Sequence, residues 1–361
     1  MTLKWSYFRS CTGFQKIVHL LRTCRPDFIQ GEVELFDLFI NSSICNLLGE
    51  PINGNLRKFW ALPLSLGGFG ITISADQSAA AFATSVFGSW ELQRASGILH
   101  PRDEATRLYQ SLFPEDMEEN YTYTTFKCSQ HDFKVQYDDR IQAALFTGSD
   151  SRTQALLNSR KMKYACSFLV AIPSLYNNQN FASQEFKCLL RYHSGMPFTL
   201  AHTKCPDCKI DTLDKFGDHA LSCKATGDRI TRHNSLGTNI STKINLFVPH
   251  TKELNIGKQR PGDLILLDHQ DEISLFADLT VVHSLCPSYR DSAASKIGGA
   301  IERREQEKYS KYDQLIQEER ILFLPLVVEV IGGWNGKGLK LLEELSRRHA
   351  DYHFIEKKVE L

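Results

Sequence analysis

Apolar residues recur along this chain with two different periods, and each period predicts a different kind of element. Over residues 1–200 the spacing is helical, with apolar side chains every three or four positions. A more polar stretch over residues 101–155 favours a helical linker. The spacing predicts helices over residues 14–23, 33–48, 75–92 and 138–146.

After residue 236 the pattern changes to short runs of apolar and β-branched residues between helical segments. Residues 263–268 and 273–283 are predicted to form the two strands of a hairpin, because a polar turn at residues 269–272 separates them. The other expected elements are a third strand over residues 324–331 and helices over residues 293–320 and 339–350.

These patterns together predict an α+β protein of several domains, which fits a length of 361 residues. The segment over residues 201–235 is rich in Cys, His, Asp and Lys and cannot build a core of its own, so it needs another staple. The expected parts are a helical N-terminal part at 1–100, a helical linker at 101–200, a small Cys/His segment at 201–235 and an α/β domain at 236–361.

Two glycine-rich segments predict turns. One is the tight turn over residues 62–71, and the other joins the third strand to the last helix at residues 332–336. The second segment lacks the spacing of a phosphate-binding loop. Glu329, inside the strand before it, is either an active-site acid or a paired structural charge.

Composition and charge narrow the function classes. Lys plus Arg and Asp plus Glu both total 42, and a net charge of zero excludes nucleic-acid binding through bulk charge. A local surplus occurs over residues 185–261, with twelve basic against seven acidic side chains. No run of 18 apolar residues occurs, so no membrane span and no membrane partner are expected.

The ten cysteines fall into two groups. Seven are scattered through mostly apolar stretches, which is typical of reduced core thiols, and three cluster between residues 205 and 223. The first ten residues contain no apolar core of a signal peptide. We therefore expect an intracellular protein in a reducing compartment.

Three cysteines and one histidine have the spacing of a structural zinc site. Cys205 and Cys208 are two residues apart, so both thiolates can face one ion from a tight turn. His219 and Cys223 have three residues between them, so one helical turn can present both. Four protein ligands close a tetrahedron around Zn²⁺ and leave no open position, which predicts a structural rather than a catalytic metal.

Other interpretations of this cluster stay open at the level of sequence. The Cys205–Cys208 pair alone also fits a redox motif. His202 and His233 are alternatives to the predicted nitrogen ligand. Asp218 either supports the metal site from behind the ligands or is solvated.

Two acids in the predicted hairpin form a second constellation. Asp263 opens the first strand, and Asp278 lies inside the apolar second strand, where a carboxylate is costly unless it is paired or metal-bound. Carboxylates that meet across a hairpin offer hard oxygen ligands to Mg²⁺, and a metal there can activate water for phosphodiester hydrolysis. Glu253 precedes the hairpin and would add a third carboxylate.

Such a site also needs a cation to balance the charge of the attacked phosphate. Lys308 and Lys311 are three residues apart on the predicted long helix and share one face. The same residues also have a structural interpretation, in which Asp263 caps a turn and Asp278 pairs with Arg260. In that interpretation the two lysines belong to a solvated helix face.

The Cys/His segment and the first glycine-rich turn resemble parts of one family. Cys205-x2-Cys208, the Gly-Asp-His-Ala-Leu-Ser-Cys run over 217–223 and Arg232-His233-Asn234 are similar to the gag-knuckle-like zinc finger of site-specific non-LTR retrotransposons. The Leu-Pro and Gly-Gly-Phe-Gly-Ile residues within 62–71 resemble the thumb region of the same reverse transcriptases. Polymerase fingers and palm would precede a thumb, and this chain begins at the thumb, so the resemblance does not imply DNA synthesis.

The C-terminal acids and lysines resemble the restriction-like PD-(D/E)xK endonuclease that follows the finger in those elements. Arg260-Pro261-Gly262-Asp263, then Asp278, then Lys308-Tyr309-Ser310-Lys311-Tyr312 match its signature in order. One residue is inserted between Pro261 and Asp263, and Thr280 stands where the ordinary third motif has lysine. In the resembling nucleases the lysine lies on the following helix.

The resemblance implies a Mg²⁺-dependent DNA endonuclease that nicks target DNA in the nucleus to start reverse transcription. Asp263 and Asp278 would bind the metal, Lys308 or Lys311 would stabilise the phosphate, and Glu253 would be an accessory acid. DNA is the expected partner, with RNA a second one. The residues expected to contact the nucleic-acid backbone are Lys224, Arg229, Arg232 and Arg260.

Two rival functions fit the same residues. In the first, the nuclease fold is catalytically inactive and the chain only binds nucleic acid. In the second, the Cys₃His staple serves folding alone, and the protein shows no salt-dependent binding of nucleic acid.

Overall fold

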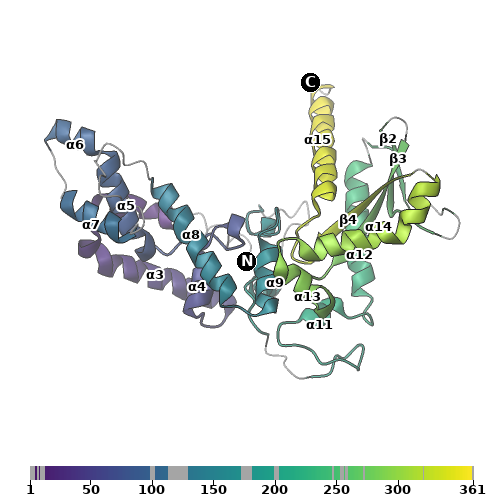
Figure 1. The fold of residues 1–361 in the computed structure, drawn as a ribbon, viewed down its shortest axis with the longest axis horizontal. Helices are drawn as coiled ribbons and strands as arrows, with labels where there is room; N and C mark the ends of the chain where they lie inside the picture. The colour runs from purple at the N-terminus through teal and green to yellow at the C-terminus, as the bar shows by residue number, and fades with distance from the viewer. Residues whose placement is uncertain are drawn as a thin grey trace. The chain divides into compact units, whose positions relative to one another are not determined.

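The computed structural model describes Trp5, Phe8 and residues 13–97, 102–112, 129–171, 181–198, 203–245, 248–252, 256, 259–270, 273–319 and 321–359. Helices dominate these residues, and one four-stranded sheet accompanies them (Figure 1). The expected α+β class is confirmed at this level. Within the same residues, no helix combines the length and the apolar character that a membrane crossing requires.

The chain forms two compact units. Unit 1 contains Met1–Gly148 and Leu169–Leu190, and unit 2 contains Ser149–Phe168 and Arg191–Leu361. The chain therefore enters unit 2, returns to unit 1 and then completes unit 2. The expected division into four segments at residues 100, 200 and 235 stays a prediction.

Unit 1 is helical in its described residues. Its α-helices are α2 (Val18–Thr23), α3 (Pro26–Leu48), α4 (Gly54–Ala61), α5 (Ala75–Gly88), α6 (Trp90–Ser96), α7 (Arg102–Leu112), α8 (Gln130–Thr147) and most of α10 (Ser183–His193). Short 3₁₀ turns are η1 (Phe14–Lys16), η2 (Leu64–Leu66) and η4 (Ser167–Leu169), the last of which crosses the unit boundary.

The glycine-rich turn over residues 62–71 has the tight geometry that its sequence predicts. A Cβ on Gly68 would lie 2.1 Å from the carbonyl oxygen of Leu62, so only glycine fits there. The turn folds Phe69 back onto Trp60, and their rings stack with centroids 4.1 Å apart. An aromatic core of unit 1 thus closes around this turn.

The helix expected over residues 75–92 is two helices. Helix α5 ends at Gly88 and α6 begins at Trp90, because Ser89 leaves the helical conformation. The small residues of α5 are buried as expected, but Leu92 is 73% exposed. The apolar run therefore extended the prediction beyond the true end of the helix.

Unit 2 contains the sheet and the residues of the candidate sites. Its helices are α9 (Ser151–Arg160), α11 (Asp218–Ser222), α12 (Asp228–Ile244), α13 (Pro287–Ser295), α14 (Gly299–Glu319) and α15 (Gly336–Val359). Its strands are β1 (His250–Lys252), β2 (Leu264–Gln270), β3 (Ile273–Val282) and β4 (Leu322–Glu329).

The sheet has the order β1-β2-β3-β4. Strands β2 and β3 are antiparallel and form the predicted hairpin, with Leu264 opposite Ala277 and Leu266 opposite Leu275. Strand β4 is parallel to β3, so the chain must cross from one end of the sheet to the other between them. Helices α13 and α14 make this crossover (Figure 1).

Alternate side chains of the strands enter two different cores, as expected from the period of two in a strand. On one face Leu264, Leu266, Ala277 and Leu279 pack with residues of α12 and α15. On the other face Ile265 and Phe276 pack with Tyr312 and Leu315 of α14. Even-numbered residues of β3 therefore point toward α14.

The single long helix expected over residues 293–320 is wrong. The structure has α13 and α14, with a break at residues 296–298. Gly298 has a φ of 73°, and a Cβ on Gly299 would lie 1.8 Å from the Ser292 carbonyl oxygen. The glycine pair therefore makes a corner that the charged helical pattern conceals.

Four further elements differ from the sequence expectations. Helix α12 and most of α13 were not predicted, because polar residues dominate both segments. Strand β4 begins and ends two residues earlier than expected, and α15 extends beyond residues 339–350 at both ends. The expected strand-to-helix turn at residues 332–336 is confirmed, and Asn335 holds it by donating to the Pro325 carbonyl oxygen at 2.9 Å.

Candidate active site and metal centre

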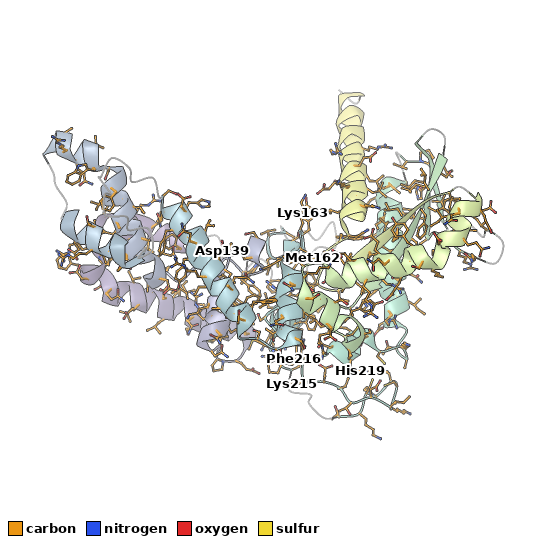
Figure 2. The ribbon with its side chains drawn as sticks, in the orientation of Figure 1. Asp139, Met162, Lys163, Lys215, Phe216 and His219 are labelled. Atoms are coloured by element: carbon orange, nitrogen blue, oxygen red, sulfur yellow. The ribbon has the colours of Figure 1, made fainter. Side chains whose placement is uncertain are left out.

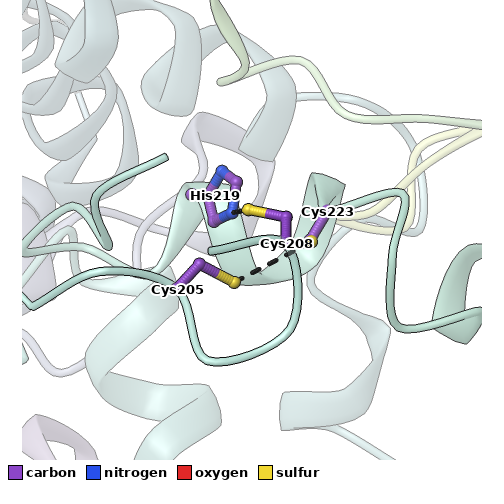
Figure 3. Close-up of side chains that lie close together, drawn as sticks. All are labelled: Cys205, Cys208, His219 and Cys223. Atoms are coloured by element: carbon purple, nitrogen blue, oxygen red, sulfur yellow. Dashed lines mark hydrogen bonds between the residues drawn. The ribbon is translucent and has the colours of Figure 1, made fainter. Parts of the chain in front are cut away.

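Cys205, Cys208, His219 and Cys223 converge in one cluster (Figure 3). Each offers one ligand atom, and these atoms all lie within 4.8 Å of one another. Cys205 Sγ is 3.9 Å from Cys223 Sγ, and Cys208 Sγ is 3.5 Å from His219 Nε2. The four residues can therefore hold a metal ion.

A tight hairpin presents the first two cysteines. The Cys205 N–H donates to the Asp211 carbonyl oxygen at 2.8 Å, and Lys209 turns the chain directly after Cys208 with a φ of 58°. Backbone N–H groups of Asp211 and Ile210 lower the pKa of the Cys208 thiol to about 7. A low pKa favours the thiolate, which is the form that binds metal.

Asp214 fixes the start of α11, which carries the other two ligands. Its carboxylate accepts the N–H groups of His219, Phe216 and Asp218 at 2.6, 2.9 and 3.1 Å. Burial acts to raise the pKa of Asp214, but these backbone bonds bring it below its usual value. The Cys223 N–H donates to the His219 carbonyl oxygen at 2.7 Å, so one turn presents both ligands.

Asp218 is buried, so the expectation that it is solvated is wrong. Arg152 of α9 binds its carboxylate through two N–H groups, at 2.5 and 2.8 Å. The same guanidinium lies 3.8 Å from the ring centroid of Phe216, which Figure 2 labels together with His219. A buried ion pair thus ties the Cys/His segment to the rest of unit 2.

Of the two alternative nitrogen ligands, the structure describes only His233, which does not join this cluster. His202 lies outside the described residues. His233 belongs to α12, and its ring reaches the acidic constellation instead. His219 is the histidine that the cluster contains.

Asp278 lies in β3 and is 4% exposed. It is an even-numbered residue of that strand, so its side chain points toward α14, and Lys308 Nζ lies 2.5 Å from Asp278 Oδ2. Burial raises the pKa of Asp278, and Lys308 opposes that rise. The structural interpretation gave Asp278 the partner Arg260, whereas its partner in the structure is Lys308.

Asp263 stands directly before β2 and next to the strand of Asp278. Its N–H donates to the Ala277 carbonyl oxygen at 3.0 Å, and its Oδ2 accepts the Leu279 N–H at 2.7 Å. The two bonds therefore join Asp263 to the residues immediately before and after Asp278. After burial, the negative charge of Asp263 is a further cause that raises the pKa of Asp278.

His233 completes this group from α12, a role that the sequence analysis missed. Its Nε2 lies 3.1 Å from Asp263 Oδ2 and 2.9 Å from the Leu279 carbonyl oxygen. The hydrogen bond to Asp263 raises the pKa of His233 to about 9. The imidazole is therefore protonated at neutral pH, and its Nε2–H donates. In the sequence, the only indication of a role for His233 was its place in the polar triplet Arg232-His233-Asn234.

Helix α14 presents three cations with the helical spacing i, i+4 and i+7. Arg304 Nε donates to Thr280 Oγ1 at 3.3 Å, and Lys308 binds Asp278. Lys311 donates to the Tyr312 hydroxyl at 2.8 Å, and its charge acts to lower the pKa of Asp278. Lys308 does not lie on a solvated helix face, because its side chain is only 12% exposed.

Of the two other candidate acids, the structure describes only Glu329, which is not part of this group. Glu253 lies outside the described residues. Glu329 is 3% exposed and pairs in register with Val282, four positions along β3 from Asp278. Burial raises the pKa of Glu329 to about 7, while hydrogen bonds from Ser159 and Ser284 act to lower it.

Asp263, Asp278, Lys308 and His233 together are called the acidic group below. A cleft of about 860 Å³ lies beside it within unit 2. Its lining includes Lys224, residues of α12 and α13, Arg304 of α14, and Thr280 with the end of β3. No Asp or Glu is among the described residues that line this cleft, so its charge is positive. The cationic lining residues are Lys224, Arg229, Arg232, His233 and Arg304. His283 also lines the cleft, but burial lowers its pKa to about 4, so it adds no charge at neutral pH.

Three of the four residues expected to contact nucleic acid thus line one cleft. The fourth, Arg260, is exposed and lies outside the lining, and its carbonyl oxygen accepts the Tyr312 hydroxyl at 2.8 Å. Arg304 was not predicted, because it belonged to the charged pattern of a helix thought to be uninterrupted.

Comparison of this chain with protein-family models gives no match, and comparison with curated proteins gives none either.

Proposed function

We propose that this protein is a retrotransposon-derived, metal-dependent DNA endonuclease with a zinc-stapled segment that binds nucleic acid. The observation that carries the proposal is the buried Asp278–Lys308 pair beside Asp263. Carboxylates that hold a metal and an ammonium group that faces phosphate are the combination that phosphodiester hydrolysis requires.

The donor set of the acidic group fits Mg²⁺. Carboxylate oxygens are the hard ligands that this ion prefers. Among the described residues, the hydrogen bonds of the Asp263 carboxylate all use Oδ2, which leaves Oδ1 for a cation. When bound there, Mg²⁺ would lower the pKa of a water molecule and polarise the phosphate.

Each side chain then has a separate task in nicking. Asp263 and Asp278 hold the cation, and Lys308 neutralises charge that develops on the attacked phosphate. The oxygen of water forms a bond to phosphorus, the bond from phosphorus to one sugar oxygen breaks, and that sugar oxygen takes up a proton. One strand is thereby cut.

The positive cleft supplies the path for the nucleic-acid backbone. Lys224, Arg229 and Arg232 line it, and cations in a groove bind phosphates through charge-assisted hydrogen bonds. Arg260 precedes Asp263 and extends the same charge outside the cleft. DNA is the proposed substrate, and RNA is an alternative ligand of the same surface.

Zn²⁺ is the metal that we propose for the Cys₃His cluster. Three thiolates and one imidazole are a common structural zinc set, and no ligand position is left for a substrate. The segment that carries these four ligands is called the knuckle below. The Arg152–Asp218 ion pair would anchor the folded knuckle to the rest of unit 2. We therefore assign the zinc to folding and not to the reaction.

The finer architecture belongs to the same proposal. The helices of unit 1 would be a thumb-like remnant with a helical linker, and the hairpin with its parallel fourth strand would be a restriction-like nuclease core. The order of glycine-rich turn, knuckle and acidic hairpin along the chain supports this assignment, as does the sheet of unit 2. The DNA would be met in the nucleus.

The test is nicking of supercoiled plasmid with Mg²⁺. We expect the native protein to produce open circles and Asp278→Asn to lose at least a thousandfold in rate, while gel-shift binding of DNA persists. Asp313→Asn, an exposed acid on the same helix as Lys308, is the matched control and should retain full activity. Equal rates for both variants would overturn the assignment of Asp278.

A second candidate function is an inactive nucleic-acid-binding remnant. Two observations favour it. Thr280 replaces the lysine of the ordinary third motif. The cationic cleft could also bind nucleic acid by itself, since neither Asp263 nor Asp278 is among its lining residues. Intact binding with no cleavage by the native protein, in Mg²⁺ or Mn²⁺, would select this function.

A further inference from the structure

Strand β3 and helix α14 face each other at two matched positions, of which the proposed function uses one. At the first, Asp278 meets Lys308. At the second, Thr280 Oγ1 accepts a hydrogen bond from Arg304 Nε at 3.3 Å. Thr280 is two residues beyond Asp278 on the same strand face, and Arg304 is one helical turn before Lys308.

The two positions are separated by similar distances on both elements. Two residues of a β-strand span roughly 6.6 Å. Four residues of an α-helix span about 6 Å. Successive phosphates of a nucleic-acid strand are joined by one sugar, which is a bridge of the same length scale. Two adjacent phosphates can therefore lie over the two positions.

Arg304 is held ready at the second position. Its Nη1 lies 2.9 Å from Glu307 Oε2, and that carboxylate also accepts the Tyr289 hydroxyl at 2.8 Å. A guanidinium has five N–H donors, and Arg304 has three hydrogen-bond partners in Thr280, Glu307 and Tyr289, so donors remain for a phosphate. The side chain is 33% exposed and lines the positive cleft together with Thr280 and His233.

We propose that Arg304 and Thr280 form a subsite for the phosphodiester next to the one that faces Lys308. This inference rests on the proposed endonuclease function. The ligand class follows from the chemistry, because a planar guanidinium binds two oxygens of one phosphate at once. Glu307 already pairs with Arg304, but no carboxylate is among the described residues that line the cleft. The subsite would fix the register of the strand over the acidic group.

Two chromogenic substrates test the subsite without knowledge of the target sequence. One is thymidine 5′-(p-nitrophenyl phosphate), with a single phosphodiester, and the other is its thymidylyl-extended form, with two. We expect Arg304→Gln to raise the KM of the two-phosphate substrate about tenfold and to leave kcat within twofold. Neither constant should change for the one-phosphate substrate. Arg304→Lys should recover part of the loss, since one point charge replaces the fork.

Equal effects of Arg304→Gln on both substrates, or no effect on either, would overturn the subsite. Thr280→Val gives a second test with a smaller change, because it removes the hydroxyl that orients Arg304 and keeps the shape of the side chain. Arg348→Gln is the matched control, since Arg348 lies on α15 outside the cleft. Its constants should equal those of the native protein.

A binding measurement separates failure of the subsite from failure of the nuclease proposal. Fluorescence anisotropy with a labelled DNA duplex, in Ca²⁺ instead of Mg²⁺, gives the slope of log Kd against log salt concentration. Loss of one phosphate contact should reduce this slope by about one in Arg304→Gln and leave it unchanged in Arg348→Gln. If native protein cleaves neither substrate but the slope changes as expected, the nuclease proposal fails and the phosphate site stands. An unchanged slope refutes the subsite, and absence of DNA binding refutes both.

Discussion

The Cys₃His knuckle and the acidic group are two regions of unit 2 that contain candidate metal ligands in different ways. The knuckle takes its four ligands from residues 205–223, a single short stretch of chain. The acidic group draws Asp263, Asp278 and Lys308 from the start of one strand, the middle of another and a later helix. Local spacing thus defines the first site, whereas tertiary packing defines the second.

The two regions also differ in how their charges are balanced. Asp278 has Lys308 as a counterion, and Asp263 has the protonated His233. In the knuckle, the bound metal itself would balance the charge of the three thiolates. Removal of metal should therefore unfold the knuckle and leave the acidic group in place.

The largest expected effect is loss of the knuckle metal. Cys223→Ser should bind Zn²⁺ at least a hundredfold more weakly, because it loses one of the four ligands. Structural zinc contributes roughly 10 kcal/mol to the folding of such segments, so this loss should also destabilise the knuckle. Native protein should contain one zinc per chain by elemental analysis, and α11 should lose its order in the variant by hydrogen exchange. Cys188→Ser, an exposed cysteine of α10, is the control and should keep its zinc. Equal zinc contents in both variants would contradict the assignment.

The next effect separates the two lysines of α14. Lys308→Met should lower the nicking rate about a thousandfold, equivalent to about 4 kcal/mol of transition-state stabilisation. Lys311→Met should lower it less than threefold, because Lys311 influences Asp278 without an ion pair to it. Plasmid nicking at saturating Mg²⁺ measures both. A larger loss in Lys311→Met would move the catalytic role to that residue.

Glu329 extends the comparison of how buried charges are balanced. Asp278 has a lysine as its counterion, whereas Glu329 has only the hydroxyl groups of Ser159 and Ser284 as hydrogen-bond partners among the described residues. Burial raises its pKa to about 7 from the ordinary 4.5, so the ionised form costs stability as pH rises from 4.5 through 7. Glu329→Gln should therefore stabilise the protein by roughly 3 kcal/mol at pH 8, and by less than about 1 kcal/mol at pH 5.

Chemical denaturation at the two pH values measures this difference. Glu318→Gln, an exposed acid on α14, is the control and should change stability little at either pH. A gain for Glu329→Gln that is equal at pH 5 and pH 8 would show that ionisation of Glu329 is not its cause.

The sequence predicted those parts of the molecule that depend on neighbouring residues. The spacing of Cys205, Cys208, His219 and Cys223 was sufficient, since a tight turn and one helical turn place all four. The β2–β3 hairpin followed from two apolar runs around a polar turn. Asp278 was recognisable because an acid inside an apolar strand is energetically costly unless something compensates it.

What the sequence did not predict depends on contacts between distant segments. The partnership of Arg152 with Asp218 joins residues 66 positions apart, and nothing near Asp218 indicates burial. His233 was weighed as a zinc ligand because it lies close in sequence to the knuckle. Only the packing of α12 on the sheet brings it to Asp263.

His233 therefore gives the last and smallest test of the comparison. Its pKa is raised by Asp263 to about 9, above the unfolded value near 6.5, so the pair contributes its full stability below pH 6.5 and loses it as pH rises through 9. His233→Gln keeps an N–H donor and removes the charge. It should destabilise unit 2 by about 1 kcal/mol at pH 6.5, since water screens a partly exposed pair.

By pH 10 the stabilities of His233→Gln and the native protein should converge, because the imidazole is then neutral in both folded and unfolded chains. Thermal melts across this range measure the difference, and elemental analysis of the same samples should show an unchanged zinc content. Loss of zinc in His233→Gln would return this residue to the knuckle. A stability difference that is the same at pH 6.5 and pH 10 would mean that the ion pair with Asp263 contributes nothing, and the acidic group would then depend on Lys308 alone for its balancing charge.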